Sequence, residues 1–188
     1  MNSQSTQHPT LLDFSDTADE PEWQAINDNV MGGQSQGEPA IRDGMLHFTG
    51  AISLENNGGF SSVRGRGHSY DLSGASGLIL RVKGDGRTYQ LRLYTSAQHQ
   101  GSRIGYSKAF PTQAGEWIEV AVPFAGLEPV YRGRRLAGPG FDPSDIQELG
   151  FLLADKRPGE FELTVDWIKV AGPGALAQNP VEPRRSEK

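Results

Sequence analysis

The residues most suited to catalysis are carboxylates in polar turns: Asp28, Glu55, Asp85 and Asp155. A glycosidase needs two such groups about 5–10 Å apart, and a sequence gives no such distance. Each also has a simpler use, because Asp85 lies in a Gly-Asp-Gly turn and Asp28 can form an Asx-turn with its own loop. Asp155, followed by Lys156, fits a solvent-exposed pair at a strand end. We therefore favour structural roles, and place an enzyme acting on sugars or nucleotides third among the functions considered.

Other catalytic chemistry has little support in this sequence. The four histidines are scattered, without the spacing of a zinc site. Cysteine is absent, which excludes a thiolate nucleophile and any disulfide. The sequence has no Gly-x-Ser-x-Gly elbow, and its glycine-rich turns lack the lysine spacing of a P-loop. We predict no catalytic residues, no metal and no cofactor.

Two glycine-glycine turns are better candidates for a binding surface. The residues concerned are Asp28, Met31, Gly32, Gly33 and Ser35 in the first turn, and Asn56, Asn57, Gly58, Gly59 and the following Arg64 in the second. Glycine accepts positive φ and short polar side chains bond nearby backbone, so turn geometry alone is one interpretation. The other is a contact surface, since an exposed methionine, two amides and an arginine exceed what a turn requires. We expect the turns to converge, with Arg64 held by Asp28 or Glu55 or free to meet a partner's carboxylate.

The tryptophans suggest carbohydrate as an alternative ligand, because aromatic faces can stack on sugar rings. Trp117 and Trp167 lie in strand-like segments and are expected to be packing residues. Trp23 is therefore the candidate platform. The arginine-rich segment 131–135 is expected to be a solvated loop.

The elements that position these residues are short and separated by turns. Glycine accounts for 24 of 188 residues, well above the usual ~7%. Apolar segments of strand length recur at 10–14, 45–48, 60–64, 78–82, 89–94, 104–110, 117–123, 146–153 and 161–170. Asp43-Gly44, Asn57-Gly58 and Asp85-Gly86 fit hairpin turns between them, and only 142–148 suggests a helical turn. The pattern predicts an all-β protein, a β-sandwich.

Length and charge limit the number of domains and the kinds of partner that this chain can have. A chain of 188 residues fits one domain, which we place at residues 11–170 between a disordered leader (1–10) and a flexible tail (171–188). The net charge of -5 argues against general binding to nucleic acid or anionic membranes. No apolar run is long enough to span a membrane, so we expect a soluble, cytoplasmic protein.

An ordered set of motifs resembles the complex I intermediate-associated protein family over roughly residues 11–170. The motifs are Asn27-Asp28-x-Val30-Met31-Gly32-Gly33-x-Ser35, Glu55-Asn56-Asn57-Gly58-Gly59-Phe60, Lys83-Gly84-Asp85-Gly86-Arg87-x-Tyr89, Tyr131-Arg132-Gly133 and Leu149-Gly150-Phe151-Leu152-Leu153-Ala154-Asp155-Lys156. The resemblance implies a galactose-binding-like jelly roll that acts as a non-catalytic, chaperone-like assembly factor. Its implied partners are protein subunits of a respiratory NADH dehydrogenase complex. The N-terminal residues do not look like a mitochondrial transit peptide, so we expect a stand-alone bacterial member. Carbohydrate binding, an analogy from the fold, is the alternative.

Overall fold

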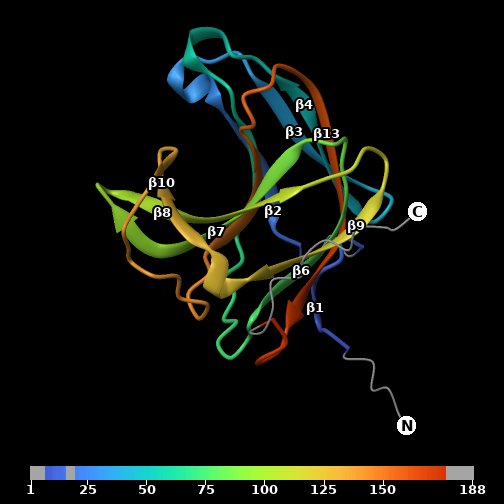
Figure 1. Cartoon of the computed structure of the whole chain (residues 1–188), viewed down its shortest axis with the longest axis vertical. Coiled ribbons are helices and arrows are strands. Elements are labelled where there is room, and N and C mark those ends of the chain that lie inside the picture. The colour runs from blue at the N-terminus through green and yellow to red at the C-terminus, as the bar shows by residue number, and fades with distance from the viewer. Residues whose placement is uncertain (1–6, 16–19, 177–188) are drawn as a thin grey trace, which may run out of the picture.

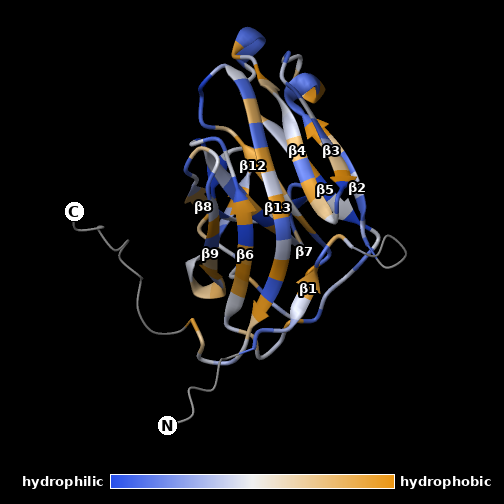
Figure 2. Ribbon diagram, turned by 90° about the vertical axis from the view of Figure 1, so that its right-hand side faces the viewer, coloured by the Kyte–Doolittle hydropathy of each residue, from blue (hydrophilic) through white to orange (hydrophobic). Residues whose placement is uncertain are grey.

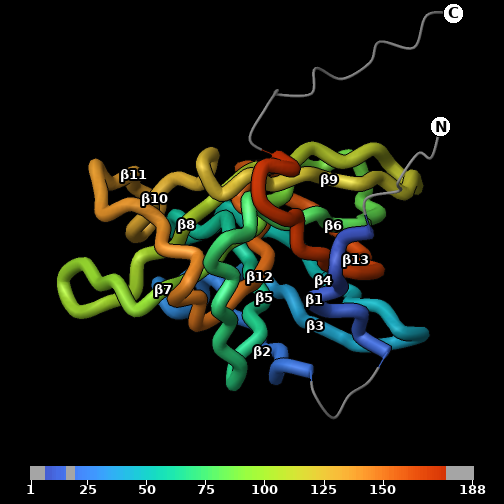
Figure 3. The backbone as a smooth tube through the Cα atoms, turned by 90° about the horizontal axis from the view of Figure 1, so that it is seen from below, coloured from blue at the N-terminus to red at the C-terminus, as the bar shows by residue number. Residues whose placement is uncertain are grey.

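The computed structural model describes residues 7–15 and 20–176 and folds them into a sandwich of two antiparallel sheets (Figures 1 and 3). Sheet A has six strands in the order β3-β4-β13-β6-β9, with β1 also paired to β13. Its strands are β1 (Thr10–Leu12), β3 (Gln36–Arg42), β4 (Met45–Ile52), β6 (Gly77–Lys83), β9 (Trp117–Pro123) and β13 (Gly159–Ala171). The predicted all-β sandwich is confirmed.

Sheet B has seven strands in the order β11-β10-β8-β7-β12-β5-β2. Its strands are β2 (Glu22–Asn27), β5 (Ser61–Arg66), β7 (Thr88–His99), β8 (Ser102–Pro111), β10 (Glu128–Tyr131), β11 (Arg134–Arg135) and β12 (Glu148–Leu153). The helical content of the described residues is limited to the short 3-10 turns η1 (Asp28–Met31), η2 (Glu55–Asn57) and η3 (Phe124–Gly126). Figure 2 shows η1 and η2 at the same end of the sandwich.

The core is built by strands that alternate between an inner and an outer face. On β7, Tyr89, Leu91 and Leu93 are fully buried, whereas the intervening Gln90 and Arg92 are partly exposed. This is the period of two that a half-buried strand requires. The alternation expected of a half-buried strand therefore holds from Tyr89 to Leu93 and places Gln90 and Arg92 away from the core. It does not extend to Tyr94, which is also buried.

An aromatic cluster joins the two sheets. Phe48 on β4 and Phe161 on β13 lie edge to face with ring centroids 4.8 Å apart. Tyr89 on β7 contacts both from the opposite sheet and stacks on Phe110 of β8 at 6.3 Å. Each aromatic side chain buries about 150–250 Å², so this cluster is a major part of the apolar stabilisation.

A buried ion pair fixes the end of the sandwich where β7 begins. The Arg87 guanidinium donates to both Asp155 carboxylate oxygens at 2.9 Å and to the carbonyls of Gly159 (3.1 Å), Glu160 (3.0 Å) and Arg157. Burial alone would raise the pKa of Asp155, but the hydrogen bonds from Arg87 outweigh it and lower that pKa below its usual value. The expected solvent-exposed pair at Asp155 was therefore wrong, because this carboxylate receives a buried guanidinium.

The sequence pattern does not predict the edge strands β2 and β3. No residue of β2 or β3 is fully buried, so neither shows the apolar alternation that marks a half-buried strand. Pro39 lies within β3, a position tolerated because β3 is the outermost strand of sheet A. Edge strands carry polar residues that limit unwanted pairing, and this weakens their signal in a sequence.

Three predicted turns were wrong. Residues 142–148 contain no helical turn, because Asp142 Oδ1 accepts hydrogen bonds from Ser144 N (3.0 Å) and Ser144 Oγ (2.7 Å) and closes a single polar turn. Asn57-Gly58 and Asp85-Gly86 do not form hairpins, since they connect β4 to β5 and β6 to β7, in each case from sheet A to sheet B. Both turns therefore cross between the layers.

The ends of the described chain pack on the sandwich. β1 begins at Thr10, inside the predicted leader, and Ala171, inside the predicted tail, is fully buried at the end of β13. Leu176 N donates to Ser76 Oγ at 3.1 Å. Residues 1–6 and 177–188 of the predicted leader and tail lie outside the described residues. Within the described part of the chain, no helix has the length and apolarity needed to cross a membrane.

Replacing Arg87 by alanine should destabilise the protein by about 3–5 kcal/mol, because it leaves the Asp155 carboxylate buried without its partner. The matched control is Arg81→Ala on β6, which breaks a 3.1 Å pair with Asp166 whose side chains are 36% and 37% exposed. That change should cost less than about 1 kcal/mol. Urea unfolding followed by tryptophan fluorescence measures both. Equal losses in the two variants would contradict the assigned role of Arg87.

Candidate functional site

The two glycine-glycine turns meet at one end of the sandwich around the carboxylate of Asp28 (Figure 1, the blue turn η1 beside the teal loop). Asp28 Oδ2 accepts hydrogen bonds from Gly59 N at 2.6 Å and Phe60 N at 3.2 Å. Asp28 Oδ1 accepts one from Ser35 N at 2.9 Å. The convergence expected from the sequence is thus present, with a single side chain as its centre. We call residues 28–35 and 54–60 the apex.

The environment of Asp28 keeps it ionised. Its side chain is 1% exposed, and burial alone would raise its pKa. The hydrogen bonds from Ser35, Gly59 and Phe60 stabilise the charged form more strongly, so the pKa lies below its usual value. Asp28 is therefore a buried, ionised carboxylate that accepts hydrogen bonds from the backbone. Near neutral pH it carries no proton that it could donate as a general acid.

Two glycines of the family motif are explained by this carboxylate. A Cβ atom at Gly33 would lie 2.4 Å from Asp28 Cγ, and one at Gly58 would lie 2.6 Å from Asp28 Oδ2. Real Cβ atoms do not approach that closely, so any larger residue would displace Asp28. Gly32 ends η1 with φ of 87°, a left-handed conformation that glycine adopts without strain.

Side-chain hydrogen bonds complete the connection between the turns. Asn56 Nδ2 donates to the Gly32 carbonyl at 3.1 Å. Ser35 Oγ donates to the Ser53 carbonyl at 3.1 Å and accepts from Ser53 N at 2.9 Å. Asn56 and Asn57 both have left-handed φ, at 55° and 59°. The backbone of the apex is therefore fixed at several independent points.

The apex carries the exposed large apolar side chains of the described residues. Val30 and Met31 on η1 are each 71% exposed, and Leu54 beside η2 is 43% exposed. Met31 is among the residues proposed from the sequence, whereas Val30 and Leu54 were missed. The sequence pattern that could have identified them is a large apolar residue inside an otherwise polar, glycine-rich turn. Such a residue does not belong to a strand that faces the core.

Arg64 is not part of this cluster. Its guanidinium lies 4.1 Å from the centroid of the Tyr94 ring, and its NH1 is 3.9 Å from Glu148 Oε2. The expected partners Asp28 and Glu55 were wrong, because the alternation of β5 places Arg64 on the outer face of sheet B beside β12 and β7.

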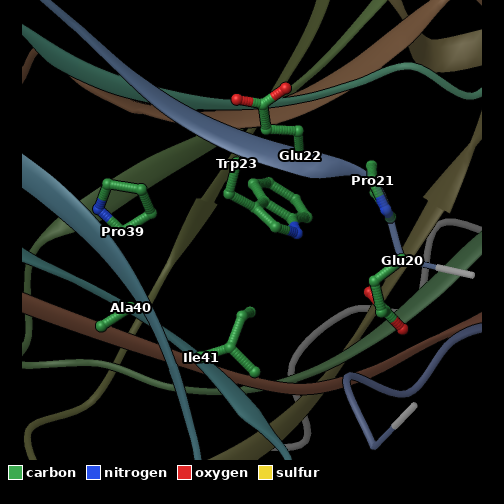
Figure 4. A pocket seen from close by; sticks show the side chains of 7 residues that line it. All are labelled: Glu20, Pro21, Glu22, Trp23, Pro39, Ala40 and Ile41. Carbon is green, nitrogen blue, oxygen red and sulfur yellow. The ribbon is translucent and has the colours of Figure 1, made fainter. Parts of the chain in front are cut away.

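Trp23 lies apart from the turns, on the core side of β2. Its ring packs at 5.9 Å against Phe14 and joins the edge of the core. It also lines a pocket of about 400 Å³ between β2 and β3, with Glu20, Pro21, Glu22, Pro39, Ala40 and Ile41. Figure 4 shows the indole at its centre, with Pro39 on one side and Glu20 on the other. Burial raises the pKa of Glu20.

No group of three or more histidine or acidic side chains in the described residues is arranged to hold a metal ion. The carboxylates singled out by sequence are instead used locally. Asp85 accepts hydrogen bonds from Arg87 N (3.1 Å), Tyr89 Oη (3.1 Å) and Glu162 N (2.9 Å). Of the candidate carboxylates, Asp28, Asp85 and Asp155 thus hold backbone or buried side chains.

The two sheets define a β-sandwich of the jelly-roll class seen in carbohydrate-binding modules. The family 11 carbohydrate-binding module from Clostridium thermocellum, in complex with a β-1,3-1,4-mixed-linked tetrasaccharide, matches with a TM-score of 0.67 at 15% identity, over 88% of this chain and 96% of that one. An agarase matches with a TM-score of 0.59 at 17% identity, over 89% of this chain and 25% of that one. Such low identities show the fold alone.

Comparison of the sequence with family models identifies the family. The chain belongs to the complex I intermediate-associated protein 30 family, whose sequence model matches residues 12–165. The mitochondrial complex I intermediate-associated protein 30 of Mus musculus is 30% identical over 182 residues, covering 84% of this chain and 54% of that protein. The Drosophila melanogaster protein of the same name is 25% identical over 132 residues, covering 68% and 44%. The chain thus spans about half the length of these curated relatives.

Asp28→Asn should destabilise the protein by about 2 kcal/mol at pH 7, because an amide cannot accept from all the donors that the carboxylate holds. The folded-state pKa of Asp28 lies below its usual 3.8, so its contribution is complete above that pH and is lost as the pH falls through the folded pKa. The stability difference between wild type and variant should therefore shrink below pH 3.8. Urea unfolding across pH measures it.

The control for this experiment is Glu119→Gln, the same loss of charge at an exposed position on β9. It should leave stability nearly unchanged at every pH. A difference between wild type and Asp28→Asn that persists undiminished into acid would show that Asp28 does not act as a carboxylate.

Proposed function

We propose that this chain is a non-catalytic, chaperone-like binding module that takes part in the assembly of a respiratory NADH dehydrogenase complex. Family membership supports the proposal, since the relatives are named for association with complex I intermediates. The apex is the surface proposed to bind, through Met31, Val30 and Leu54, with Asp28, Gly32, Gly33, Ser35, Asn56, Asn57, Gly58 and Gly59 holding its shape.

The observation that carries this proposal is apolar exposure on a fixed backbone. Val30 and Met31 are 71% exposed, yet the turns that bear them are tied together through Asp28 and Asn56. Exposed apolar side chains on a rigid support are typical of contact surfaces, because binding then loses little conformational entropy. Methionine adapts its shape to the surface it meets.

The structural roles of the candidate carboxylates support a binding function over catalysis. Asp28, Asp85 and Asp155 each accept several hydrogen bonds from the fold. A glycosidase needs a pair of carboxyl groups facing a shared substrate space. Glu55 alone remains exposed among these four, which leaves no such pair in this set.

Affinity capture with a Val30→Ser/Met31→Ser double variant tests the role of the apex. The wild-type chain, used as bait in extracts of its native cell, should recover NADH dehydrogenase subunits. The double variant should recover less than about one-tenth of that amount, because a few central apolar residues carry most of an interface's energy. Its melting temperature should stay unchanged, since both side chains are exposed.

The control bait is Ile79→Ser, an apolar-to-polar change at a half-buried position on β6 of sheet A. It should capture as the wild type does, provided that its melting curve shows a folded protein. Recovery of the same subunits by the apex double variant would contradict the apex as the docking surface. Absence of such subunits from the wild-type capture would contradict the assembly role itself.

Carbohydrate binding is the second candidate function, and the pocket beside Trp23 is the observation that favours it. An indole edge, apolar walls and the carboxylate of Glu20 are the kinds of groups that hold a sugar ring. The fold is also that of carbohydrate-binding modules, which is an analogy.

A glycan screen separates the two functions. Under the assembly proposal, the wild-type chain binds no glycan. Binding that disappears in Trp23→Ala and persists in Trp117→Ala would establish the carbohydrate function instead. Trp117 is a suitable control because it lies on β9 beneath Arg81 and Lys83, outside the pocket. Melting curves of both variants show whether loss of binding reflects loss of the fold.

A further inference from the structure

The outer face of sheet B carries a row of polar side chains across several strands. The row is fixed by register: Gln24 on β2 pairs with Arg64 on β5, which pairs with Gly150 on β12. Gly150 pairs with Arg92 on β7, which pairs with Ser107 on β8. Neighbouring strands lie about 4.8 Å apart, so Arg64 and Arg92 flank a position that has no side chain.

A second row beside it places an acidic residue among several arginines. Glu148 Oε1 lies 2.9 Å from Arg103 NH1 and 3.7 Å from Arg66 Nε, and its Oε2 lies 3.9 Å from Arg64 NH1. One carboxylate thus faces three guanidinium groups. Arg92 adds a further positive charge, and its NH2 hydrogen-bonds only to Gln90 Oε1 among the described residues, at 3.2 Å. The centre of this face is positive although the chain as a whole carries -5.

Several donors on this face have no acceptor. The Nε atoms of Arg64, Arg66 and Arg92 are buried and lack a hydrogen-bond partner among the described residues. Buried donors without partners are unfavourable by about 1–3 kcal/mol each and are uncommon in folded proteins. These Nε atoms are themselves covered, but the guanidinium groups that carry them reach solvent, since the side chains of Arg64 and Arg66 are 24% and 42% exposed. The Arg103 side chain is also 42% exposed. The face thus presents an excess of positive charge whose remaining acceptors can come from another molecule.

The aromatic group on this face is already covered. The Tyr94 ring is 4% exposed, with the Arg64 guanidinium above it and Gly105 of β8 close to its edge. A Cβ atom at Gly105 would lie 3.1 Å from Tyr94 Cε1, so the glycine allows the ring to lie flat on the sheet. A neutral sugar would find no free ring to stack on, whereas a carboxylate would find guanidinium groups whose planar forks match it.

We propose that this arginine face, composed of Arg64, Arg66, Arg92 and Arg103, binds an acidic segment of a partner polypeptide. Side-chain carboxylates of the segment would accept hydrogen bonds from the solvent-facing ends of these guanidinium groups, beside Glu148. The inference does not depend on the apex or on the assembly role, because it rests on charge complementarity at a separate surface. An acidic polypeptide of any origin would satisfy it.

The test measures fluorescence anisotropy of a labelled oligoglutamate peptide titrated with the full chain. Binding should be present at low salt and should weaken steadily with added salt, since charges are screened over about 8–10 Å near physiological ionic strength. Arg92→Ala should weaken binding by about tenfold, the effect of losing one charge-assisted hydrogen bond. Arg103→Ala provides a second variant, and melting curves confirm that each is folded.

The matched control is Arg42→Ala, which removes the same charge from an exposed position on β3 of sheet A. Its binding should equal that of the wild type. Equal weakening in Arg42→Ala and Arg92→Ala would overturn the proposal by showing a nonspecific charge effect. No binding of oligoglutamate above that of a neutral glycine-serine peptide would overturn it as well. A third result would also overturn the proposal: binding of a mixed-linked glucan tetrasaccharide that does not depend on salt and is lost in Arg92→Ala. The face would then be a sugar site.

Discussion

The buried carboxylate of Asp28 is the constraint on which the geometry of the apex depends. A charged group with 1% exposure is tolerated only when hydrogen bonds replace the water it has lost, and Asp28 finds them in the backbone of both turns. The need to surround this carboxylate accounts for Gly33 and Gly58, which leave room for it. The motif that looks like a flexible glycine loop in the sequence is a closely packed structure around a charge.

The same logic explains a second pair of family motifs. The segment 83–89 supplies Arg87 and the segment 149–156 supplies Asp155, and the two meet in one buried ion pair. Arg87, next to β7 of sheet B, also donates to the Gly159 and Glu160 carbonyls at the start of β13 in sheet A, so it ties the two sheets. Motifs that are distant in the chain thus share one structural purpose. Their presence in a family pattern does not require that they contact a ligand.

The sequence predicts the layers of this protein better than its sites. The alternation of apolar and polar residues, as on β7, identifies core residues directly. A strand with one buried and one exposed face must repeat its apolar residues every second position. It fails for β2 and β3, which lie at the sheet edges and contain no fully buried residue. Convergence of the Gly-Gly turns was foreseen, but the partners of Arg64 and Asp155 were not. A side chain's partner depends on strand register across the sheets, which no local pattern encodes.

The two proposed surfaces differ in the physics by which they would hold a partner. The apex presents Val30 and Met31 on a backbone fixed by Asp28, so these side chains cannot be covered by a collapse of their own loops. Apolar contact of this kind mainly slows dissociation, whereas a positive face such as that around Arg92 mainly accelerates encounter with an acidic partner. One partner that carries both an acidic segment and an apolar groove would gain from each surface independently. Binding at two such surfaces needs no movement within the sandwich, which suits a fold whose apex is held by Asp28 and whose two sheets are tied by the Arg87–Asp155 pair.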